Sequence, residues 1–220
     1  MDGSERGNRR SGPLAMMLGD SKRQLVLASA SEVRARLLRD AGVPFCVEPA
    51  AIDEETAREG LRALGSRTED AASALAELKA LAVAARHDER TLVLGCDQIL
   101  ECEGEWFAKP RDREEARAQL RRLRGRRHRL VSAGVLVCAG SRLWHKVETA
   151  ELWVRSFSDE FLEWYLETAG SDLLRSVGAY RIEGIGIQLF ARIEGDIFTI
   201  LGLPLLSLLQ ALRDQGLLAR

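Results

Sequence analysis

The sequence predicts a three-layer α/β fold in which a mixed, twisted sheet is flanked by helices. In the first half of the chain, short apolar runs typical of buried strands alternate with segments whose apolar residues recur at helical spacing. In the second half, strand-like segments follow one another in pairs. Together the two patterns are typical of a mixed sheet covered by helices.

Length and composition indicate the domain organisation. The chain has 220 residues, of which 46% are hydrophobic, and this is enough to form a sizeable core. Residues 1–22 contain Gly, Ser, Arg and Asn with little periodicity, so we expect a disordered N-terminal extension or a mis-assigned start there. Residues 23–220 contain no repeat or linker, and we expect them to form one domain.

Composition also argues against several classes of function. A net charge of −1 gives no overall attraction to nucleic acid or to a membrane surface, and no apolar run approaches the roughly 20 residues that span a bilayer. Only three histidines occur, and the four cysteines form no CxxC pair, which argues against a zinc enzyme or a histidine-based triad. We expect a cytoplasmic protein whose cysteines are small buried side chains.

The first predicted elements are a strand, a serine-rich turn and a helix. Residues 25–28 are apolar, Ser29 and Ser31 follow, and residues 32–40 have helical spacing that Gly42 closes. Such a turn places hydroxyl and backbone N–H groups at a helix N-terminus, where they can bind phosphate. Simple capping of the helix by Ser31 explains the same residues equally well.

The next segments give the centre of the fold. Residues 45–48 form a predicted strand, and residues 69–86 form a long predicted helix that carries Lys79. Residues 91–100 form another predicted strand, which the segment Gly95-Cys96-Asp97-Gln98 interrupts.

The second half continues with further helices and strands. Asp112 caps a predicted helix that ends at Leu123, and Gly125 follows as its C-terminal glycine. The remaining predicted elements are strands over residues 130–139 and 143–154, a helix capped by Ser158 and ending near residue 168, a hairpin of residues 187–193 and 197–201, and a closing helix over residues 205–215.

Asp97 is the strongest candidate for chemistry. A carboxylate inside an apolar strand costs free energy unless it binds something. Enzymes of the α/β class place ligands where strands end at a crevice of the sheet, and a carboxylate there suits metal binding or general-base catalysis. The alternative is that Asp97 is a turn residue at the end of the strand.

Lysines and paired acidic residues supply further candidates. Lysine is scarce in this arginine-rich chain, yet Lys79 lies on a predicted helix and Lys109 precedes Pro110. A need for a compact ammonium donor would explain both, and solvated surface lysines are the alternative. Glu54 and Glu55 can share a divalent cation, but they are also typical of the first turn of a helix.

Two other segments allow two interpretations each. Residues 121–129 hold six arginines and His128, which can bind nucleic acid phosphates, although cations are also favourable at the C-terminal end of a helix. Residues 178–186 are rich in glycine, with Glu183 between apolar residues. They fit a loop that brings the backbone close to a base or phosphate, or a plain glycine turn.

Together, the order and spacing of these motifs resemble the Maf family of nucleotide pyrophosphatases over about residues 25–212. The resemblance rests on Leu27-Ala-Ser-Ala-Ser31 with Arg34, Asp53-Glu54, Gly95-Cys96-Asp97-Gln98, Lys109-Pro110, Leu123-Arg-Gly125 with His128, Gly178-Ala-Tyr180, Glu183-Gly184 and Gly202-Leu-Pro-Leu205. It implies the fold that Maf proteins share with inosine triphosphate pyrophosphatases.

The resemblance also implies an activity and a set of roles. Such an enzyme hydrolyses nucleoside triphosphates to a nucleoside monophosphate and pyrophosphate with a divalent cation (Mg²⁺, Mn²⁺ or Co²⁺), and many members are homodimers. The catalytic proton acceptor falls on Asp97, and Asp97 and Glu54 become the expected metal ligands. The other implied residues are the catalytic lysines Lys79 and Lys109 and the phosphate-binding Ser29, Ser31 and Arg34.

Three positions bear on the base that such an enzyme recognises. Val33 stands where the family often has an arginine linked to pyrimidine selection. Gln98 and Glu183 stand where the dTTP/UTP branch has Thr and Gln. This pair resembles the branch that acts on 7-methyl-GTP, although that branch often has Trp at the position of Val33. We therefore expect a house-cleaning activity on modified nucleotides, with dTTP/UTP hydrolysis as the alternative.

Three other functions are compatible with the sequence alone. One is a pyrophosphatase of the inosine triphosphate kind, and the second is a non-enzymatic nucleotide-binding regulator of cell division. The third is RNA binding through residues 121–129, although the near-neutral net charge makes nucleic acid an unfavoured partner.

Overall fold

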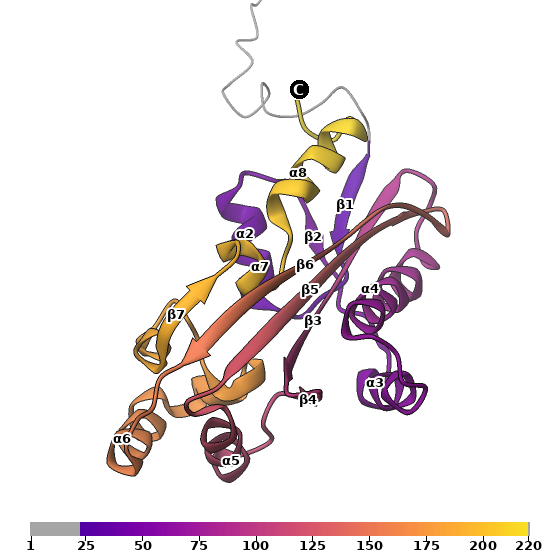
Figure 1. Cartoon of the computed structure of the whole chain (residues 1–220). Helices are drawn as coiled ribbons and strands as arrows, with labels where there is room; N and C mark the ends of the chain where they lie inside the picture. The colour runs from indigo at the N-terminus through magenta and orange to yellow at the C-terminus, as the bar shows by residue number, and fades with distance from the viewer. Residues whose placement is uncertain (1–22, 220) are drawn as a thin grey trace, which may run out of the picture.

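The computed structural model describes residues 23–219, and a seven-stranded sheet forms its centre (Figure 1). The strands are β1 (Gln24–Leu27), β2 (Cys46–Val47), β3 (Thr91–Cys102), β4 (Glu105–Phe107), β5 (Arg127–Cys138), β6 (Ser141–Val154) and β7 (Phe190–Glu194). Their order is β2-β1-β3-β5-β6-β7, and β4 pairs with the end of β3. β1 is parallel to β2 and β3, whereas all the other pairs are antiparallel. The predicted mixed sheet is therefore confirmed.

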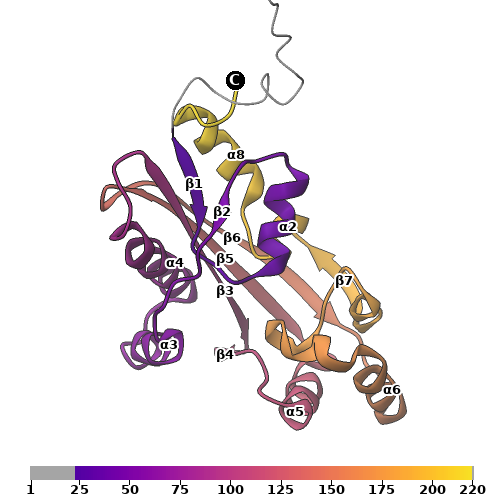
Figure 2. The same cartoon turned by 180° about the vertical axis from the view of Figure 1, so that it is seen from behind.

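Helices cover both faces of this sheet. They are α2 (Glu32–Asp40), α3 (Glu54–Ala63), α4 (Thr68–Ala84), α5 (Arg113–Leu123), α6 (Asp159–Ala169), α7 (Ile197–Ile200) and α8 (Leu205–Asp214), with 3₁₀ helices η1 (Gly170–Leu174), η2 (Val177–Ala179) and η3 (Ile185–Leu189). In both views, α5 and α6 lie together at the end of the sheet opposite to α8 (Figures 1 and 2). The three-layer α/β class is thus also confirmed.

The alternation of side chains along β3 separates the core into layers. Val93 and Ile99 pack in the cluster that contains the apolar residues of α4. Leu92 and Leu94 point to the other face and pack in the cluster that contains α2 and α8. A third cluster lies around α5 and α6. Since β3 contributes to all three clusters, it fixes the helices on both faces relative to one another.

The predicted helix ends agree with the structure. The side chains of Ser31, Asp112 and Ser158 each accept a hydrogen bond from the first turn of α2, α5 and α6, respectively. Gly42 and Gly125 follow the C-caps of α2 and α5 with φ of 69° and 73°, the left-handed conformation that glycine adopts readily.

Two predictions about the strands are wrong. The segment from Gly95 to Gln98 does not interrupt the third strand, because β3 continues through it with regular pairing to β5. The predicted hairpin of residues 187–193 and 197–201 is absent: residues 187–189 belong to η3, residues 190–193 lie in β7, which pairs with β6, and residues 197–200 form α7. Asp196 explains this change, since its Oδ1 accepts hydrogen bonds from the backbone N–H groups of Phe198 and Thr199 and so begins a helix.

Two elements and one cysteine also differ from the predictions, and one prediction concerns residues that the structure does not describe. Helix α3 and strand β4 were not predicted. Cys96, Cys102 and Cys138 are buried as expected, but Cys46 on β2 is exposed. The extension predicted for residues 1–22 lies outside the described residues. Within residues 23–219, no helix combines the length and the apolar character needed to cross a bilayer.

Candidate functional site

A pocket of about 540 Å³ lies at the edge of β3. β1 pairs with β3 as far as Leu94, and β4 pairs with it from Leu100 onward. Between these points, residues 95–99 of β3 have a strand partner only on the β5 side within the described part of the chain. Side chains from both faces of the sheet can therefore reach this gap.

The structure brings together all of the site residues that the sequence predicts. The pocket is lined by Ser29, Ser31, Val33, Arg34, Glu54, Lys79, Asp97, Gln98, Lys109 and Glu183, together with other residues.

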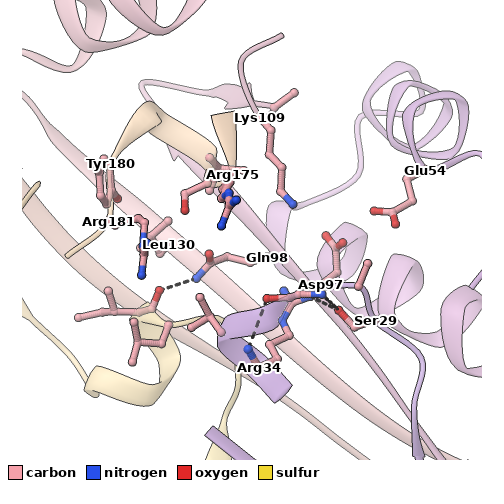
Figure 3. A pocket seen from close by; sticks show the side chains of 18 of the residues that line it. Ser29, Arg34, Glu54, Asp97, Gln98, Lys109, Leu130, Arg175, Tyr180 and Arg181 are labelled. Atoms are coloured by element: carbon pink, nitrogen blue, oxygen red, sulfur yellow. Dashed lines mark hydrogen bonds between the residues drawn. The ribbon is translucent and has the colours of Figure 1, made fainter. Parts of the chain in front are cut away.

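The pocket has two ends because neighbouring strand residues point in opposite directions. Asp97 points toward α4 and contacts Lys79, whereas Gln98 points toward α7 and contacts its backbone. We call the part around Glu54, Lys79 and Asp97 the carboxylate end, and the part around Gln98, Tyr180 and Glu183 the loop end. Figure 3 shows Glu54 and Asp97 on one side of the cavity and Gln98 and Tyr180 toward the other.

The carboxylate end is built around a buried lysine between two acids. Lys79 Nζ lies 2.7 Å from Asp97 Oδ1 and 2.6 Å from Glu54 Oε2. The side chains of Lys79 and Asp97 are only 6% and 3% exposed, so the charges compensate each other away from water. Asp97 Oδ2 is also buried, and among residues 23–219 it has no hydrogen-bond partner. A buried carboxylate oxygen without a partner is costly, which indicates that it binds a ligand.

The acids at this end fit a cation that is held jointly with a substrate. In the described residues, no three His, Cys, Asp or Glu side chains cluster in a way that would hold a metal by themselves. Mg²⁺ needs fewer protein ligands, because one or two carboxylates suffice when phosphate oxygens and waters complete its octahedron. The carboxylates that would serve as these one or two ligands are Asp97, through Oδ2, and Glu54, which contacts the other side of the Lys79 ammonium.

Gly95 brings Lys79 within reach of Asp97. A Cβ atom at Gly95 would lie 2.0 Å from the carbonyl oxygen of Ala76 and 2.9 Å from Cβ of Ala80, both on α4. Only a residue without a side chain allows α4 to approach the strand so closely. Lys79 lies between these two contact points on the helix, so its ammonium reaches Asp97, two residues beyond Gly95 on the same face.

Arg34 crosses the gap from the opposite face. Its Nε donates to the carbonyl oxygen of Gly202 at 2.8 Å, and its Nη1 donates to Ser29 Oγ and to the carbonyl oxygen of Cys96, both at 3.1 Å. Ser31 instead caps α2, since its hydroxyl accepts from the backbone N–H of Arg34 at 3.4 Å. The capping interpretation therefore holds for Ser31, while Ser29 orients the guanidinium.

Arg58 is a pocket residue that the sequence analysis missed. Its Nη2 lies 3.9 Å from Asp97 Oδ1, and its side chain is 21% exposed. Asp53 caps α3 by accepting from the backbone N–H of Thr56, so α3 begins at Glu54 and Arg58 follows one turn later. Spacing of four residues places Glu54 and Arg58 on the same helical face, and this signal was present in the sequence.

Lys109 extends into the pocket from the segment after β4 (Figure 3). Part of its side chain is open to solvent, and it forms no ion pair with a described residue. The surrounding protein atoms nevertheless lower the pKa of the Lys109 ammonium, and the positive charge of Arg34 lowers it further. Lys109 is thus a cation without a close acidic partner, directed at the same cavity as Asp97.

At the loop end, the backbone fixes the orientation of the Gln98 amide. Gln98 Nε2 donates to the carbonyl oxygens of Thr199 and Ile200 at 3.1 and 3.0 Å and to Ser132 Oγ at 2.9 Å. Carbonyl oxygens accept only, so the NH₂ group must face them. The amide oxygen is therefore left as an acceptor for a ligand.

Glu183 is held by two arginines at the same end. Arg36 on α2 and Arg181 in the neighbouring loop lie 3.2 and 3.3 Å away, and both contacts are to Glu183 Oε1. For the described residues, Oε2 has no recorded ion pair, and it is the second acceptor at the loop end. Val33 also lines the pocket and adds an apolar surface to it.

A buried histidine supports the glycine-rich loop. His128 Nε2 lies 2.7 Å from the hydroxyl of Tyr180, which lines the pocket. Burial lowers the pKa of His128 to about 4, so the ring is neutral near pH 7. Gly178 has φ of 76°, and a Cβ there would lie 2.6 Å from Leu100, which means that the loop approaches the protein core closely. Its glycines thus serve packing as well as any ligand.

The arginines of residues 121–129 do not form a free basic surface. Each of the six has an acidic partner within ion-pair distance. Arg129, for example, lies 2.5 Å from Glu101 and 2.9 Å from Glu69. Such pairing removes most of the attraction that RNA phosphates would need.

Comparison with known proteins agrees with the geometry of the pocket. The profile of the Maf-like protein family matches residues 24–215. A protein of Paramagnetospirillum magneticum named nucleoside triphosphate pyrophosphatase is 52% identical over 191 residues, covering 87% of this chain and 98% of that protein. A protein of the same name from Granulibacter bethesdensis is 51% identical, with 87% and 96% covered. A protein of Rhizobium meliloti named 7-methyl-GTP pyrophosphatase is 50% identical over 192 residues, again with 87% and 96% covered.

Proposed function

We propose a mechanism and a preferred substrate from the premise that this chain belongs to the Maf-like protein family and hydrolyses nucleoside triphosphates to a nucleoside monophosphate and pyrophosphate. The observation that carries the mechanism is the buried, unpartnered Oδ2 of Asp97 in a pocket lined by several cations. A triphosphate carries about four negative charges near neutral pH, and such a pocket offsets them.

In the proposed reaction, a water molecule attacks the α-phosphorus. Asp97 accepts a proton from this water, and the water oxygen forms a new bond to the α-phosphorus. The bond from the α-phosphorus to the α,β-bridging oxygen breaks. The electron pair of the broken bond leaves with pyrophosphate. Lys79 holds the Asp97 carboxylate in place through its 2.7 Å contact.

In this mechanism, the cationic side chains of the pocket bind the pyrophosphate leaving group. Lys109, Arg34 and Arg58 point into the cavity, and we assign them to the β- and γ-phosphates. Ser29 orients Arg34 through its 3.1 Å hydrogen bond. A divalent cation bound at Asp97 and Glu54 would neutralise phosphate oxygens and make the α-phosphorus more electrophilic.

For the base, we propose a preference for 7-methyl-GTP over dTTP and UTP. The loop end offers two acceptors, Gln98 Oε1 and Glu183 Oε2, and guanine presents two adjacent donors, N1–H and N2–H. Thymine and uracil each present a single N3–H between two carbonyl oxygens, which would face these acceptors unfavourably. The positive charge of a 7-methylated guanine also favours a nearby carboxylate.

A panel of triphosphates tests both parts of this proposal. We expect purified protein to release pyrophosphate and monophosphate, with kcat/KM for 7-methyl-GTP roughly 10²-fold above that for dTTP or UTP. A Gln98→Thr, Glu183→Gln double variant should lose most of this difference. Diphosphate and orthophosphate as first products would contradict the mechanism, and a wild-type preference for dTTP or UTP would contradict the base assignment.

The same proposal includes a divalent cation and a homodimer in the cytoplasm. Activity should disappear with a chelator and return with Mg²⁺, Mn²⁺ or Co²⁺. Sedimentation at micromolar concentration should give about twice the mass of 24.4 kDa. Full turnover in excess chelator would remove the metal from the mechanism.

A further inference from the structure

A row of polar residues crosses the sheet beneath α7. Gln98 on β3 stands opposite Ser132 on β5, and Ser132 stands opposite Glu148 on β6. Ser132 is fully buried. Polar side chains in the interior of a sheet are costly unless their hydrogen bonds are made, so the partners of this row indicate its purpose.

The hydrogen bonds of the row converge on the C-terminal end of α7. The carbonyl oxygen of Thr199 accepts from Ser132 Oγ at 2.7 Å and from Gln98 Nε2 at 3.1 Å, and that of Ile200 accepts from Gln98 at 3.0 Å. Helix α7 has only four residues, so its last carbonyl groups cannot be satisfied by a further turn. Ser132 and the Gln98 NH₂ group, which we call the α7 tether, supply side-chain donors to these carbonyl groups.

Two more hydrogen bonds connect the end of α7, which the α7 tether holds, to Arg34 in the pocket. The backbone N–H of Gly202 donates to the carbonyl oxygen of Thr199 at 3.0 Å. The carbonyl oxygen of Gly202 then accepts from Arg34 Nε at 2.8 Å. Gly202 has φ of 93°, which suits glycine, and a Cβ there would lie 3.2 Å from Arg34 Nε. The direction of the Gly202 carbonyl therefore depends on where the tether holds Thr199.

Arg34 has one part of its guanidinium left for a ligand. The hydrogen bonds recorded with described residues use Nε and Nη1. Nη2 is consequently available to phosphate, and its direction is set by the other two nitrogens because the group is planar.

We propose that Ser132 is a positioning residue for phosphate binding, acting with the Gln98 NH₂ group through the end of α7 and Gly202 to orient Arg34. This inference rests on the proposed role of Arg34 as a phosphate ligand. Ser132 does not line the pocket, so its effect is separable from any reading of the base.

The test measures inhibition by inorganic pyrophosphate together with kcat/KM for four triphosphates. Ser132→Ala should raise the inhibition constant of pyrophosphate roughly 5- to 20-fold, since charge-assisted hydrogen bonds are sensitive to geometry. It should lower kcat/KM by the same factor for 7-methyl-GTP, GTP, dTTP and UTP. Ser132→Thr, which keeps the hydroxyl, should restore most of the loss.

A double-mutant cycle shows whether Arg34 transmits the effect. Arg34→Lys removes Nη2 and should itself weaken pyrophosphate inhibition. In that background, Ser132→Ala should cost less than about twofold. A multiplicative effect of the two substitutions would overturn the inference, as would a loss that depends on the base. If Arg34→Lys leaves pyrophosphate inhibition unchanged, the phosphate role of Arg34 is wrong, which is a separate failure.

Two further variants distinguish the proposed role of Ser132 from a general disturbance of α7. Thr199→Val removes a hydrogen bond of the same helix to Glu148 but leaves the Thr199 carbonyl and the tether intact. It should change the pyrophosphate inhibition constant by less than twofold, and an effect equal to that of Ser132→Ala would overturn the inference. If Ser132→Ala does not fold, Gln98→Leu breaks the other half of the tether, and the same non-additivity with Arg34→Lys is expected.

Discussion

Asp97 combines a buried charge with an unsatisfied oxygen, and this combination gives the clearest prediction for a single residue. Asp97→Asn keeps the shape of the side chain but removes its basicity and one favourable charge for Lys79. We expect turnover to fall roughly 10²- to 10⁴-fold, while Glu54 still compensates Lys79 and the fold is retained. Circular dichroism and single-turnover kinetics measure the two effects, and near wild-type turnover would exclude Asp97 from the reaction.

Arg58 gives a second prediction at this scale, with a control on the same helix. Arg58→Ala should lower kcat/KM about tenfold or more, because a cation next to Asp97 would lose its contact with the substrate. Arg62 lies one turn later, outside the pocket, and Arg62→Ala should change kcat/KM less than about twofold. Equal effects of the two substitutions would mean that α3 as a whole is perturbed and that Arg58 has no special contact.

The difference between Asp97 and Arg58 shows which site residues can be predicted from a sequence. Asp97 was predictable because a lone carboxylate in an apolar run has few structural explanations. Arg58 was missed because α3 itself was not predicted: the helix has only partly buried apolar residues, Ala57 and Leu61, on the core side. The tertiary position of α3 decides that Arg58 points inward, and this position depends on residues far away in the chain.

Among the elements, the contact between α4 and β3 depends most on a single position. Gly95→Ala would place a methyl group 2.0 Å from the Ala76 carbonyl oxygen, so α4 must move away from the strand. We expect a loss of about 1–3 kcal/mol in the free energy of unfolding and a loss of activity, because Lys79 moves with the helix. Urea denaturation and the pyrophosphate assay measure these effects.

Gly60 on α3 provides the matched substitution. A Cβ atom there would have no described atom within 4 Å, and the residue lies inside a helix. Gly60→Ala should therefore stabilise the protein by up to about 1 kcal/mol, since alanine loses less backbone entropy on folding. Destabilisation by both substitutions to the same extent would contradict the proposed role of close packing at Gly95.

Most of the elements were predictable from sequence, and the most instructive of the misses is α7. Helices α2, α5 and α6 combine periodic apolar residues with side-chain caps at their N-termini, so their type and position followed directly from the sequence. Residues 197–200 (Ile, Phe, Thr, Ile) have a composition typical of strands, yet they form a helix. The cap at Asp196 and the tether at the other end outweigh the intrinsic preference, and the tether donors lie on β3 and β5.

At the scale of the whole molecule, His128 makes stability depend on pH. Burial lowers its pKa to about 4 in the folded protein, below the ordinary value of 6.5. The unfolded chain therefore binds the proton more tightly, and stability falls as pH drops from 6.5 toward 4. Linkage gives a loss of about 2 kcal/mol between pH 7 and pH 5 from this residue.

A variant without the imidazole isolates this contribution. His128→Gln is less stable at pH 7 because it disturbs the contact with Tyr180, but its stability should fall less than that of the wild type between pH 7 and pH 5. Urea midpoints at the two pH values give the comparison. Parallel losses in the two proteins would show that folding does not lower the pKa of His128.

The gap in the sheet at residues 95–99 of β3 also bears on solubility. A strand edge without a partner strand offers free N–H and C=O groups to any extended peptide, and natural proteins usually cover such edges or place charges beside them. Residues 95–97 and 99 are buried, so this edge is covered. Here Arg34 does both, since it hydrogen-bonds the carbonyl oxygen of Cys96 and brings a positive charge to the edge. The side chain that we assign to phosphate thus also blocks strand addition by a second polypeptide. Loss of Arg34 would therefore expose the protein to aggregation, and a bound nucleotide would protect it.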